Sequence, residues 1–293
     1  MGEALIGREL EQEQLNTWVD EASAGQGSVV LLAGEAGVGK TTLAHHTLAN
    51  SGLRVLEGLA VQGGTSPFGP IVEALRSYLR TTGEVPVTAG PLAAHLALLL
   101  PELGPPPPAG DRATLFEAIR QALAAISKGR PTAIFLDDLQ WADDATPELV
   151  GALARSVDTE PLLLLAAFRS DELPRGHAIR RLRSELRRAG RLRQITIEPL
   201  GAEPSAALLE RTLGTVAPPL RRAVFDRTDG VPFFVRELGS ALAASGRLVP
   251  GASGLELLKG EDVPLPDSVR DAVLLRAAGL SNAAREAVTT AAV

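Results

Sequence analysis

The sequence contains no cysteine and very few aromatic residues. Among its 293 residues there are one Met, one Tyr and two Trp, and aromatic residues make up 3%. The lack of cysteine excludes disulfides, cysteine-ligated metals and thiol nucleophiles, and it is compatible with a reducing compartment. Ala, Leu, Gly, Pro and Arg are used heavily, a bias typical of a G+C-rich bacterial genome.

Long hydrophobic runs and an excess of positive charge are also missing. The longest strongly apolar run covers residues 161–168, far short of a membrane span. Residues 1–9 lack the basic-then-apolar order of a signal peptide. The net charge of −6 gives no general attraction to nucleic acid or to acidic membranes. We therefore expect a cytoplasmic protein that does not bind membranes.

A glycine-rich segment indicates phosphate binding. It reads Gly34, Glu35, Ala36, Gly37, Val38, Gly39, Lys40, Thr41, which is the spacing of a P-loop. An apolar run precedes it and a helical pattern follows, so backbone N–H groups at a helix N-terminus would surround an anion. Lys40 would reach the β- and γ-phosphates, and the Thr41 hydroxyl would coordinate Mg²⁺. An ordinary glycine turn before a helix is the weaker explanation.

Short apolar runs alternate with helical patterns over the first 200 residues. The alternation predicts an α/β fold, a parallel sheet with helices on both faces, because continuous apolar strands fit a sheet buried on both sides. The predicted strands are 29–33, 55–59, 132–136, 162–168 and 193–197. The predicted helices are 10–24, 42–50, 70–79, 114–126, 147–157 and 178–188.

Two stretches rich in Gly and Pro interrupt this pattern. Residues 104–110 predict a stiff loop, and residues 248–266 predict a linker. After residue 200 the strand signals end and helical patterns continue. The predicted helices there are 202–213, 220–227, 233–244 and 269–278.

Two carboxylates follow the strand predicted at 132–136. Asp137 and Asp138 would stand at the edge of a parallel sheet where ligands bind, on a strand neighbouring the P-loop strand. We interpret Asp137 as the acid that holds Mg²⁺, directly or through water, and Asp138 as the residue that orients the attacking water. The alternative is a pair of turn acids at a strand end.

An arginine follows the strand predicted at 162–168. Arg169 would contact the γ-phosphate and distinguish ATP from ADP. The alternative is a surface residue or a salt bridge to Asp171 or Glu172.

Residues 137–143, DDLQWAD, resemble the Walker B signature of STAND-type P-loop ATPases. More narrowly, they resemble the ATPase module of large LuxR-type bacterial transcriptional regulators. Other segments resemble family motifs in the same order: 6–9 of the adenine pocket, 167–170 of sensor 1, 230–238 with a GxP motif, and 265–270 at the start of a winged helix. Val231 stands where the family commonly has Asn.

The resemblance implies an AAA+/STAND-like P-loop fold, with ATP or ADP and Mg²⁺ as cofactors. It implies an ATPase core at 1–200, a helical lid at 201–250, and a linker with an incomplete winged-helix-like region at 251–293. Thr41 and Asp137 would hold Mg²⁺, and Lys40, Asp137, Asp138 and Arg169 would act in hydrolysis. The implied nucleotide contacts are Gly7, Arg8, Gly34, Glu35, Ala36, Gly37, Val38, Gly39, Lys40, Thr41, Thr42 and Pro232.

The same resemblance implies a signalling switch in transcription regulation. The family carries a helical-repeat sensor and a DNA-binding helix-turn-helix beyond the region matched here. We therefore expect a piece of a longer protein that binds DNA and an inducer through other regions and self-associates with nucleotide.

Two other functions remain open at this point. A small-molecule kinase would need a mobile arginine-rich lid, and residues 175–193 contain eight arginines opposed only by Glu185. A DNA-associated AAA+ ATPase shares the type of start seen at residues 7–9, but it would require a complete winged helix. For the arginines of 175–193, a nucleic-acid or acidic-partner patch is an alternative, but the segment has no aromatic residue for base stacking. We interpret the segment as a solvated helix, with an arginine finger as a further alternative.

Overall fold

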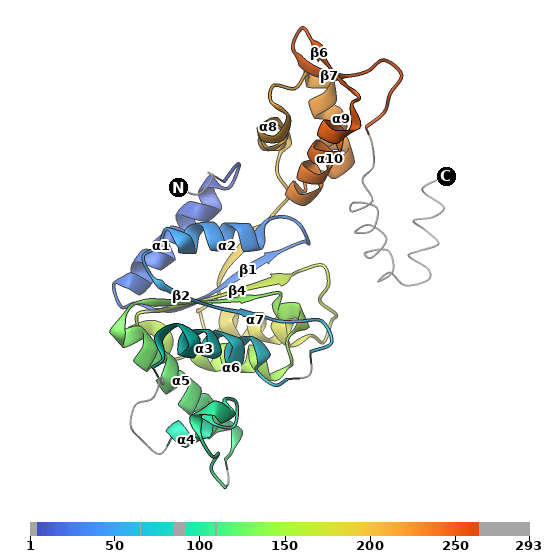
Figure 1. The fold of residues 1–293 in the computed structure, drawn as a ribbon. Coiled ribbons are helices and arrows are strands. Elements are labelled where there is room, and N and C mark those ends of the chain that lie inside the picture. The colour runs from blue at the N-terminus through green and yellow to red at the C-terminus, as the bar shows by residue number, and fades with distance from the viewer. Residues whose placement is uncertain (1–4, 65, 85–91, 109, 264–293) are drawn as a thin grey trace. The chain divides into compact units, whose positions relative to one another are not determined.

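The chain consists of two compact units, Met1–Glu198 and Pro199–Val293. The computed structural model describes residues 5–64, 66–84, 92–108 and 110–263. In the described part of the first unit, strands and helices alternate as the sequence predicts, whereas the second unit is mainly helical (Figure 1). The division at 200 and 250 into core, lid and winged-helix region stays a prediction.

The first unit is built on a five-stranded parallel sheet in the described part of the chain. Its order is β2-β3-β4-β1-β5, and each neighbouring pair is parallel. Strands β1 and β4 are buried along almost their whole length, as continuous apolar runs require. The strands are β1 (Ser28–Gly34), β2 (Arg54–Leu59), β3 (Thr132–Asp137), β4 (Leu162–Arg169) and β5 (Arg193–Ile197). All five strand predictions are therefore confirmed.

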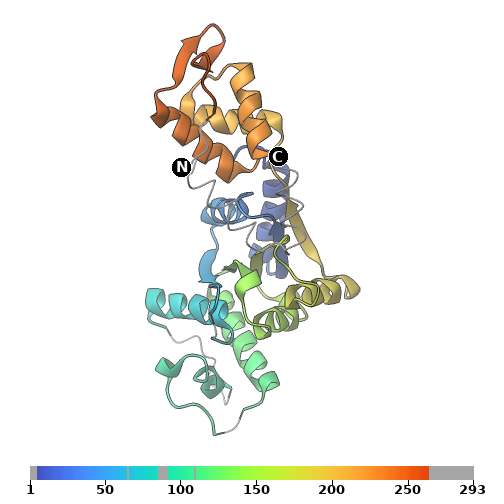
Figure 2. The same ribbon diagram turned by 90° about the vertical axis from the view of Figure 1, so that its right-hand side faces the viewer.

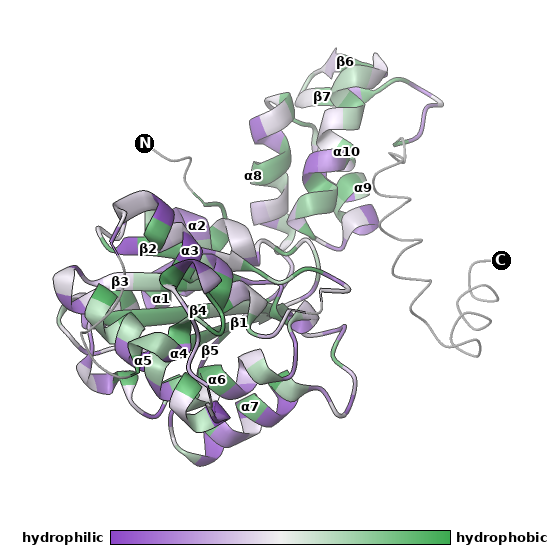
Figure 3. Ribbon diagram, turned by 60° about the horizontal axis from the view of Figure 1, so that its bottom comes forward, coloured by the Kyte–Doolittle hydropathy of each residue, from purple (hydrophilic) through white to green (hydrophobic). Residues whose placement is uncertain are grey.

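Helices cover both faces of this sheet. Side chains of α1 and α2 pack with Val30, Leu32 and Phe135 on one face. Side chains of α3, α5, α6 and α7 pack with Leu31 and Phe168 on the other (Figures 1 and 2). Alternate strand residues thus enter two separate cores, and the central strand β4 is hydrophobic up to its last residue, Arg169 (Figure 3).

The helices of the first unit follow the predicted positions closely. They are α1 (Glu9–Ser23), α2 (Lys40–Ala49), α3 (Gly69–Thr82), α4 (Ala93–Leu96), α5 (Arg112–Gly129), α6 (Ala145–Leu153) and α7 (Ala178–Arg188). Short 3-10 turns, η1 (Pro101–Leu103), η2 (Leu139–Trp141) and η3 (Val157–Thr159), join them. Helix α6 starts earlier than the predicted 147–157, where the Asp143 carboxylate accepts a hydrogen bond from the Ala145 N–H at 3.0 Å, and it ends at Leu153. The described residues of 104–110 form a loop without regular structure, as predicted.

The described part of the second unit, residues 199–263, packs three helices around its own core. They are α8 (Ala202–Leu213), α9 (Pro218–Thr228) and α10 (Pro232–Ser245). Val224, Val235 and Leu242 are buried in that core. These helices confirm the three predicted at 202–244. The predicted helix at 269–278 and the segment at 265–270 lie outside the described residues.

The prediction of a linker at 248–266 is wrong in its first half. Strands β6 (Leu248–Gly251) and β7 (Gly254–Leu257) form an antiparallel hairpin. The hairpin is fixed by Leu255, whose backbone N–H and C=O bond to Thr215 and Ala217 at 2.9 and 3.0 Å. Its strands are short and contain Pro and Gly, which hides the strand signal. The four-residue turn between two short apolar segments was the clue available in the sequence.

Candidate nucleotide site

The P-loop has the backbone geometry that phosphate binding requires. It connects the buried strand β1 to the N-terminus of α2, where backbone N–H groups and the helix dipole face the same point. Gly39 has φ of +100°, a conformation open to glycine and costly for other residues. A Cβ on Gly34 would lie 2.5 Å from the Ile197 carbonyl oxygen. Both glycines are therefore required by the fold of the loop itself.

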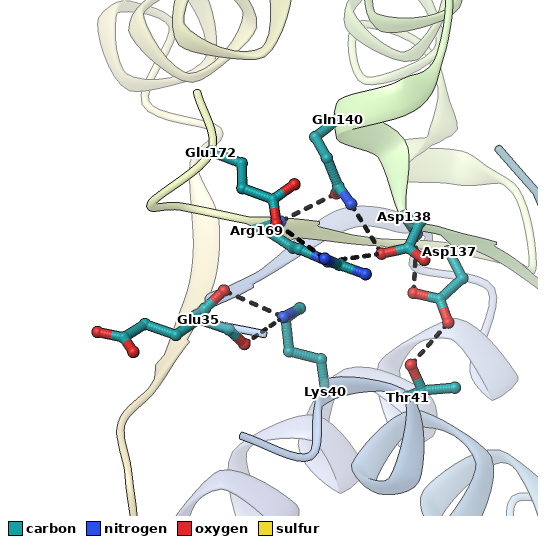
Figure 4. A network of polar contacts seen from close by, with 9 residues as sticks. Glu35, Lys40, Thr41, Asp137, Asp138, Gln140, Arg169 and Glu172 are labelled. Carbon is teal, nitrogen blue, oxygen red and sulfur yellow. Dashed lines mark hydrogen bonds and ion pairs between the residues drawn. The ribbon is translucent and has the colours of Figure 1, made fainter. Parts of the chain in front are cut away.

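Lys40 lies across the P-loop and is nearly buried, with 6% of its surface exposed. Its Nζ donates hydrogen bonds to the carbonyl oxygens of Gly34 at 3.0 Å and Glu35 at 2.7 Å (Figure 4). Both acceptors are neutral. The ammonium is thereby held at the mouth of the loop by partners that a phosphate can readily replace.

Thr41, in the first turn of α2, and Asp137, at the end of β3, meet directly, although β4 separates β3 from the P-loop strand β1. The Thr41 Oγ1 donates to Asp137 Oδ2 at 2.6 Å (Figure 4). The prediction that Asp137 lies on a strand neighbouring the P-loop strand is wrong, because β4 lies between β3 and β1 in the sheet. The contact forms nevertheless because α2 packs across β1, β4 and β3, which brings its first turn to the end of β3.

The intervening strand places Arg169 between the P-loop and the two acids. Arg169 pairs in register with Gly34 of β1. Its guanidinium contacts Asp138 Oδ1 at 3.3 Å and Glu172 Oε1 at 2.8 Å (Figure 4). The salt bridge to Glu172 that the sequence left as an alternative is therefore present, in addition to the contact with Asp138. The sensor role of Arg169 stays a prediction.

Gln140 completes the network around Asp138 and was not assigned a role from sequence. Its Nε2 donates to Asp138 Oδ1 at 2.8 Å, and its Oε1 accepts from the Arg169 backbone N–H at 3.0 Å. Asp138 itself has φ of +50°, an uncommon backbone conformation for a residue other than glycine. The signal available was the position of Gln140 within DDLQWAD, but only the fold reveals its partners.

These contacts form two clusters at the same sheet edge. The P-loop cluster contains Lys40, Thr41 and Asp137. The acid–arginine cluster contains Asp138, Gln140, Arg169 and Glu172. The described residues include no group of three or more His, Cys, Asp or Glu side chains arranged to hold a metal alone.

Burial and neighbouring charges shift the pKa values of both cations. Burial lowers the pKa of Lys40, and the nearby Arg169 lowers it further, against the opposing effect of Asp138, Asp137 and Asp171. Burial also acts to lower the pKa of Arg169, but its contacts with Glu172 and Asp138 outweigh burial and raise it. Lys40 is therefore the cation whose charge depends most on its surroundings.

Arg8 fastens the start of the chain to the P-loop. Its guanidinium donates to the Val38 carbonyl at 3.0 Å and to the Glu198 carbonyl at 2.7 Å, and it pairs with Glu11 at 3.1 Å. Gly7 precedes it with φ of +63°. Arg8 thus lies against the P-loop, and its contact with nucleotide stays a prediction. The contact to Glu198 could not be read from sequence.

Pro232 belongs to the second unit and is the first residue of α10. Gly230 before it has φ of +73°, and a Cβ there would lie 1.9 Å from the Leu200 carbonyl oxygen. Val231, where the family commonly has Asn, is 4% exposed in the apolar core of this unit. The turn is therefore intact without an Asn, and the role of Pro232 at adenine stays a prediction.

The arginine-rich segment is only partly a solvated helix. Ile179, Leu182 and Leu186 bury one face of α7. Several arginines have specific partners: Arg183 bonds to Gln194 and lies over the Phe168 ring, and Arg193 pairs with Glu21. Arg183 thus joins α7 to β5 and β4, and Arg193 joins β5 to α1. The basic patch and the arginine finger stay predictions.

A parallel sheet of this order, a P-loop opening α2, and acids at the end of β3 define a P-loop nucleoside triphosphatase. A model of the AAA ATPase domain matches residues 4–165, more than half of the sequence. The chain belongs to this family, and its fold implies nucleotide binding.

Two known proteins are similar to this chain in sequence or in structure. An uncharacterized protein of Rhizobium meliloti (strain 1021) is 26% identical in an alignment of 269 positions that covers 81% of this chain and 25% of that protein. The chain thus spans about a quarter of the length of this relative. A Walker-type ATPase of Pyrococcus abyssi superimposes with a TM-score of 0.51 at 15% identity over 81% of this chain and 68% of that one, which shows the shared fold.

A weaker structural similarity involves a signal-transduction ATPase with numerous domains, a STAND protein with a tetratricopeptide repeat sensor, from Pyrococcus horikoshii. It is 16% identical, with a TM-score of 0.48, over 79% of this chain and 29% of that one. Within the described residues, the structure has no helix long and apolar enough to cross a membrane.

Proposed function

We propose that this chain is an ATP-binding, slowly hydrolysing switch module of a bacterial transcriptional regulator. The observation that carries the nucleotide part is the contact of Thr41 with Asp137 at 2.6 Å beside the buried Lys40. The regulatory part rests on the ordered family motifs. Both parts go beyond the AAA ATPase domain assignment.

The residues at the sheet edge fit Mg²⁺ bound together with phosphate. Mg²⁺ prefers oxygen ligands and is commonly held by one or two side chains, several waters and substrate phosphates. The Thr41 hydroxyl and the Asp137 carboxylate supply such oxygens, and they already lie in hydrogen-bond contact. When bound, Mg²⁺ would neutralise charge on the β- and γ-phosphates.

The chain's own residues would supply positioning and positive charge. Lys40 would exchange the carbonyls of Gly34 and Glu35 for phosphate oxygens. Asp138 would orient water, and Arg169 would contact the γ-phosphate after release from Glu172. Gly7, Arg8 and Pro232 would contribute to the adenine side.

We expect hydrolysis to be slow because Asp138 and Arg169, which would act on water and on the γ-phosphate, are already bonded to other side chains. Asp138 is bonded to Gln140 and Arg169, so it must exchange contacts before it can accept a proton or orient water. A switch gains from such a delay because each nucleotide state then persists long enough to be sensed. We further propose self-association with nucleotide, and DNA and inducer binding through other regions of a longer protein.

Phosphate release from ATP tests this proposal. We expect turnover below about 1 s⁻¹, the lower end of typical kinase rates, with water as the acceptor. Asp138→Asn should reduce release at least about tenfold, whereas Asp144→Asn, an exposed acid in the same loop, should not. Transfer of phosphate to a small molecule, or strong stimulation by DNA, would instead support the kinase or the DNA-associated ATPase.

A further inference from the structure

A second cavity lies on the same unit, beside the edge strand β2. It measures about 650 Å³, within the range of small-molecule sites. Its walls come from the end of β2, from α3, from the segment around η1, and from Trp141 to Asp143 after β3. The P-loop does not contribute to it, so this cavity is separate from the nucleotide site.

Several apolar side chains that line the cavity are exposed to solvent when no ligand is bound. Leu59, Val61 and Leu98 are 48%, 62% and 45% exposed, and all three line it. They are half of the six large apolar side chains that the described residues leave exposed. Such a concentration at one hollow indicates a ligand with an apolar body.

Most charged groups of the lining already have partners. Glu73 accepts a hydrogen bond from the Leu59 N–H at 2.8 Å, and Arg76 pairs with Glu102 at 2.9 Å. The Asp143 carboxylate accepts from the N–H groups of Phe68 and Ala145.

Arg80 differs from these groups. It is exposed, lines the cavity, and makes no ion pair within the described ranges. The lining therefore offers one guanidinium able to bind an acidic group without first losing a partner.

We propose that this cavity binds a small amphipathic organic acid. Its apolar body would lie against Leu59, Val61 and Leu98, and its single acidic group would bond to Arg80. The indole of Trp141 forms part of the wall. A carboxylate and a phosphate monoester share the required chemistry.

The wall of the cavity is hydrogen-bonded to the segment that carries the site acids. The Ala60 N–H donates to the Asp137 carbonyl at 3.0 Å. The Phe68 N–H donates to Asp143 Oδ1 at 3.0 Å. A ligand here would therefore contact Ala60, which is bonded to one end of 137–143, and Asp143, which is the other end. Resting on the proposed nucleotide function, we infer that this acid is an effector that changes nucleotide affinity.

Trp141 provides a direct reporter of binding. The chain has two tryptophans, Trp18 and Trp141, so Trp18→Phe leaves the cavity tryptophan alone. In this background, decanoate should change the emission saturably, and decyl phosphate should do the same if a phosphate serves equally well. Decanol, with the same chain and no charge, should bind at least about tenfold more weakly.

Two substitutions test the assigned contacts. Arg80→Gln should weaken decanoate at least about tenfold and leave decanol unchanged. Arg187→Gln removes the same charge from α7 and should leave both unchanged. Val61→Asp, at an exposed position that tolerates a polar group, should abolish the binding of both decanoate and decanol. Equal binding of decanol and decanoate, no saturable change with either acid, or decanoate affinity insensitive to Arg80→Gln would overturn the proposal.

The effector role is tested separately by measuring ADP affinity with and without saturating decanoate. Coupling must be reciprocal, so decanoate affinity should change by the same factor when ADP is present. We expect a change of at least about fivefold. Decanoate binding with no effect on ADP would refute the effector role and leave the cavity assignment. Failure of ADP to bind at all would instead refute the nucleotide proposal, while the tryptophan titration would stand.

Discussion

The two clusters at the sheet edge hold their cations in different ways. In the P-loop cluster, Lys40 hydrogen-bonds to neutral carbonyls. In the acid–arginine cluster, Arg169 contacts two carboxylates, Asp138 and Glu172. The first cation gains a charged partner when phosphate arrives, whereas the second must give one up. Nucleotide binding at Lys40 should therefore need no loss of an ion pair. Sensing of the γ-phosphate and hydrolysis should require Arg169 and Asp138 to exchange partners first.

Removing the cation of the P-loop cluster should have the largest effect. Lys40→Met should weaken ATP and ADP at least about 100-fold, because two charge-assisted hydrogen bonds to phosphate are lost. Competition against a fluorescent nucleotide measures both affinities. Lys128→Met, on the C-terminal turn of α5, is the matched control. Affinity within threefold of the unchanged protein would contradict the role of Lys40.

Removing the cation of the acid–arginine cluster should affect hydrolysis more than binding. Arg169→Gln should lower the rate of phosphate release about 10- to 100-fold and leave ADP affinity within about threefold. The preference for ATP over ADP should disappear with it. A comparable loss of ADP affinity would show that the two clusters act as one.

Weakening the ion pair between Arg169 and Glu172 should raise ATP affinity instead of lowering function. Glu172→Gln removes one of its carboxylate partners, so ATP affinity should rise by about two- to fivefold, as expected for a partly exposed pair. Glu148→Gln, which breaks the exposed pair with Arg112, serves as the control and should change nothing. A fall in ATP affinity would mean that Glu172 positions Arg169 correctly instead of restraining it.

The smallest expected effect is the pH dependence of Lys40. Because burial lowers its pKa, the ammonium loses its proton at a lower pH than an exposed lysine. Bound phosphate favours the charged form, so ATP affinity should fall as pH rises through the lowered pKa, and binding should take up protons there. Calorimetry in two buffers of different ionisation enthalpy measures this uptake. Lys40→Arg, which stays charged, should lose it.

The sequence predicts the P-loop cluster better than the acid–arginine cluster. The P-loop is contiguous, and its glycines, Lys40 and Thr41 are required by local backbone geometry and phosphate chemistry. Glu172 is only three residues from Arg169, so that pair could be proposed from sequence, whereas the contact of Gln140 with Arg169 depends on β3 lying beside β4. The prediction that β3 lies beside β1 is wrong, because β4 lies between them. Arg169, the last residue of β4, therefore lies between the P-loop strand and the strand that carries the acids.

The fold shows the same contrast between local and non-local signals. Long apolar runs and helical periodicity identify β1 to β5 and the principal helices. The hairpin of β6 and β7 was missed because its stability comes from pairing with residues near Val216 and not from its own composition. Helix α4 is four residues long, too short for periodicity to reveal.

Calorimetric titration of ATP with and without Mg²⁺ tests the central claim most directly. The contact of Thr41 with Asp137 beside Lys40 predicts one site per chain, with affinity at least about tenfold higher when Mg²⁺ is present. Asp137→Asn should remove most of this difference while ATP still binds. Absence of ATP binding, or equal affinity with Mg²⁺ and with a chelator, would contradict the assignment of this edge as an ATP·Mg²⁺ site.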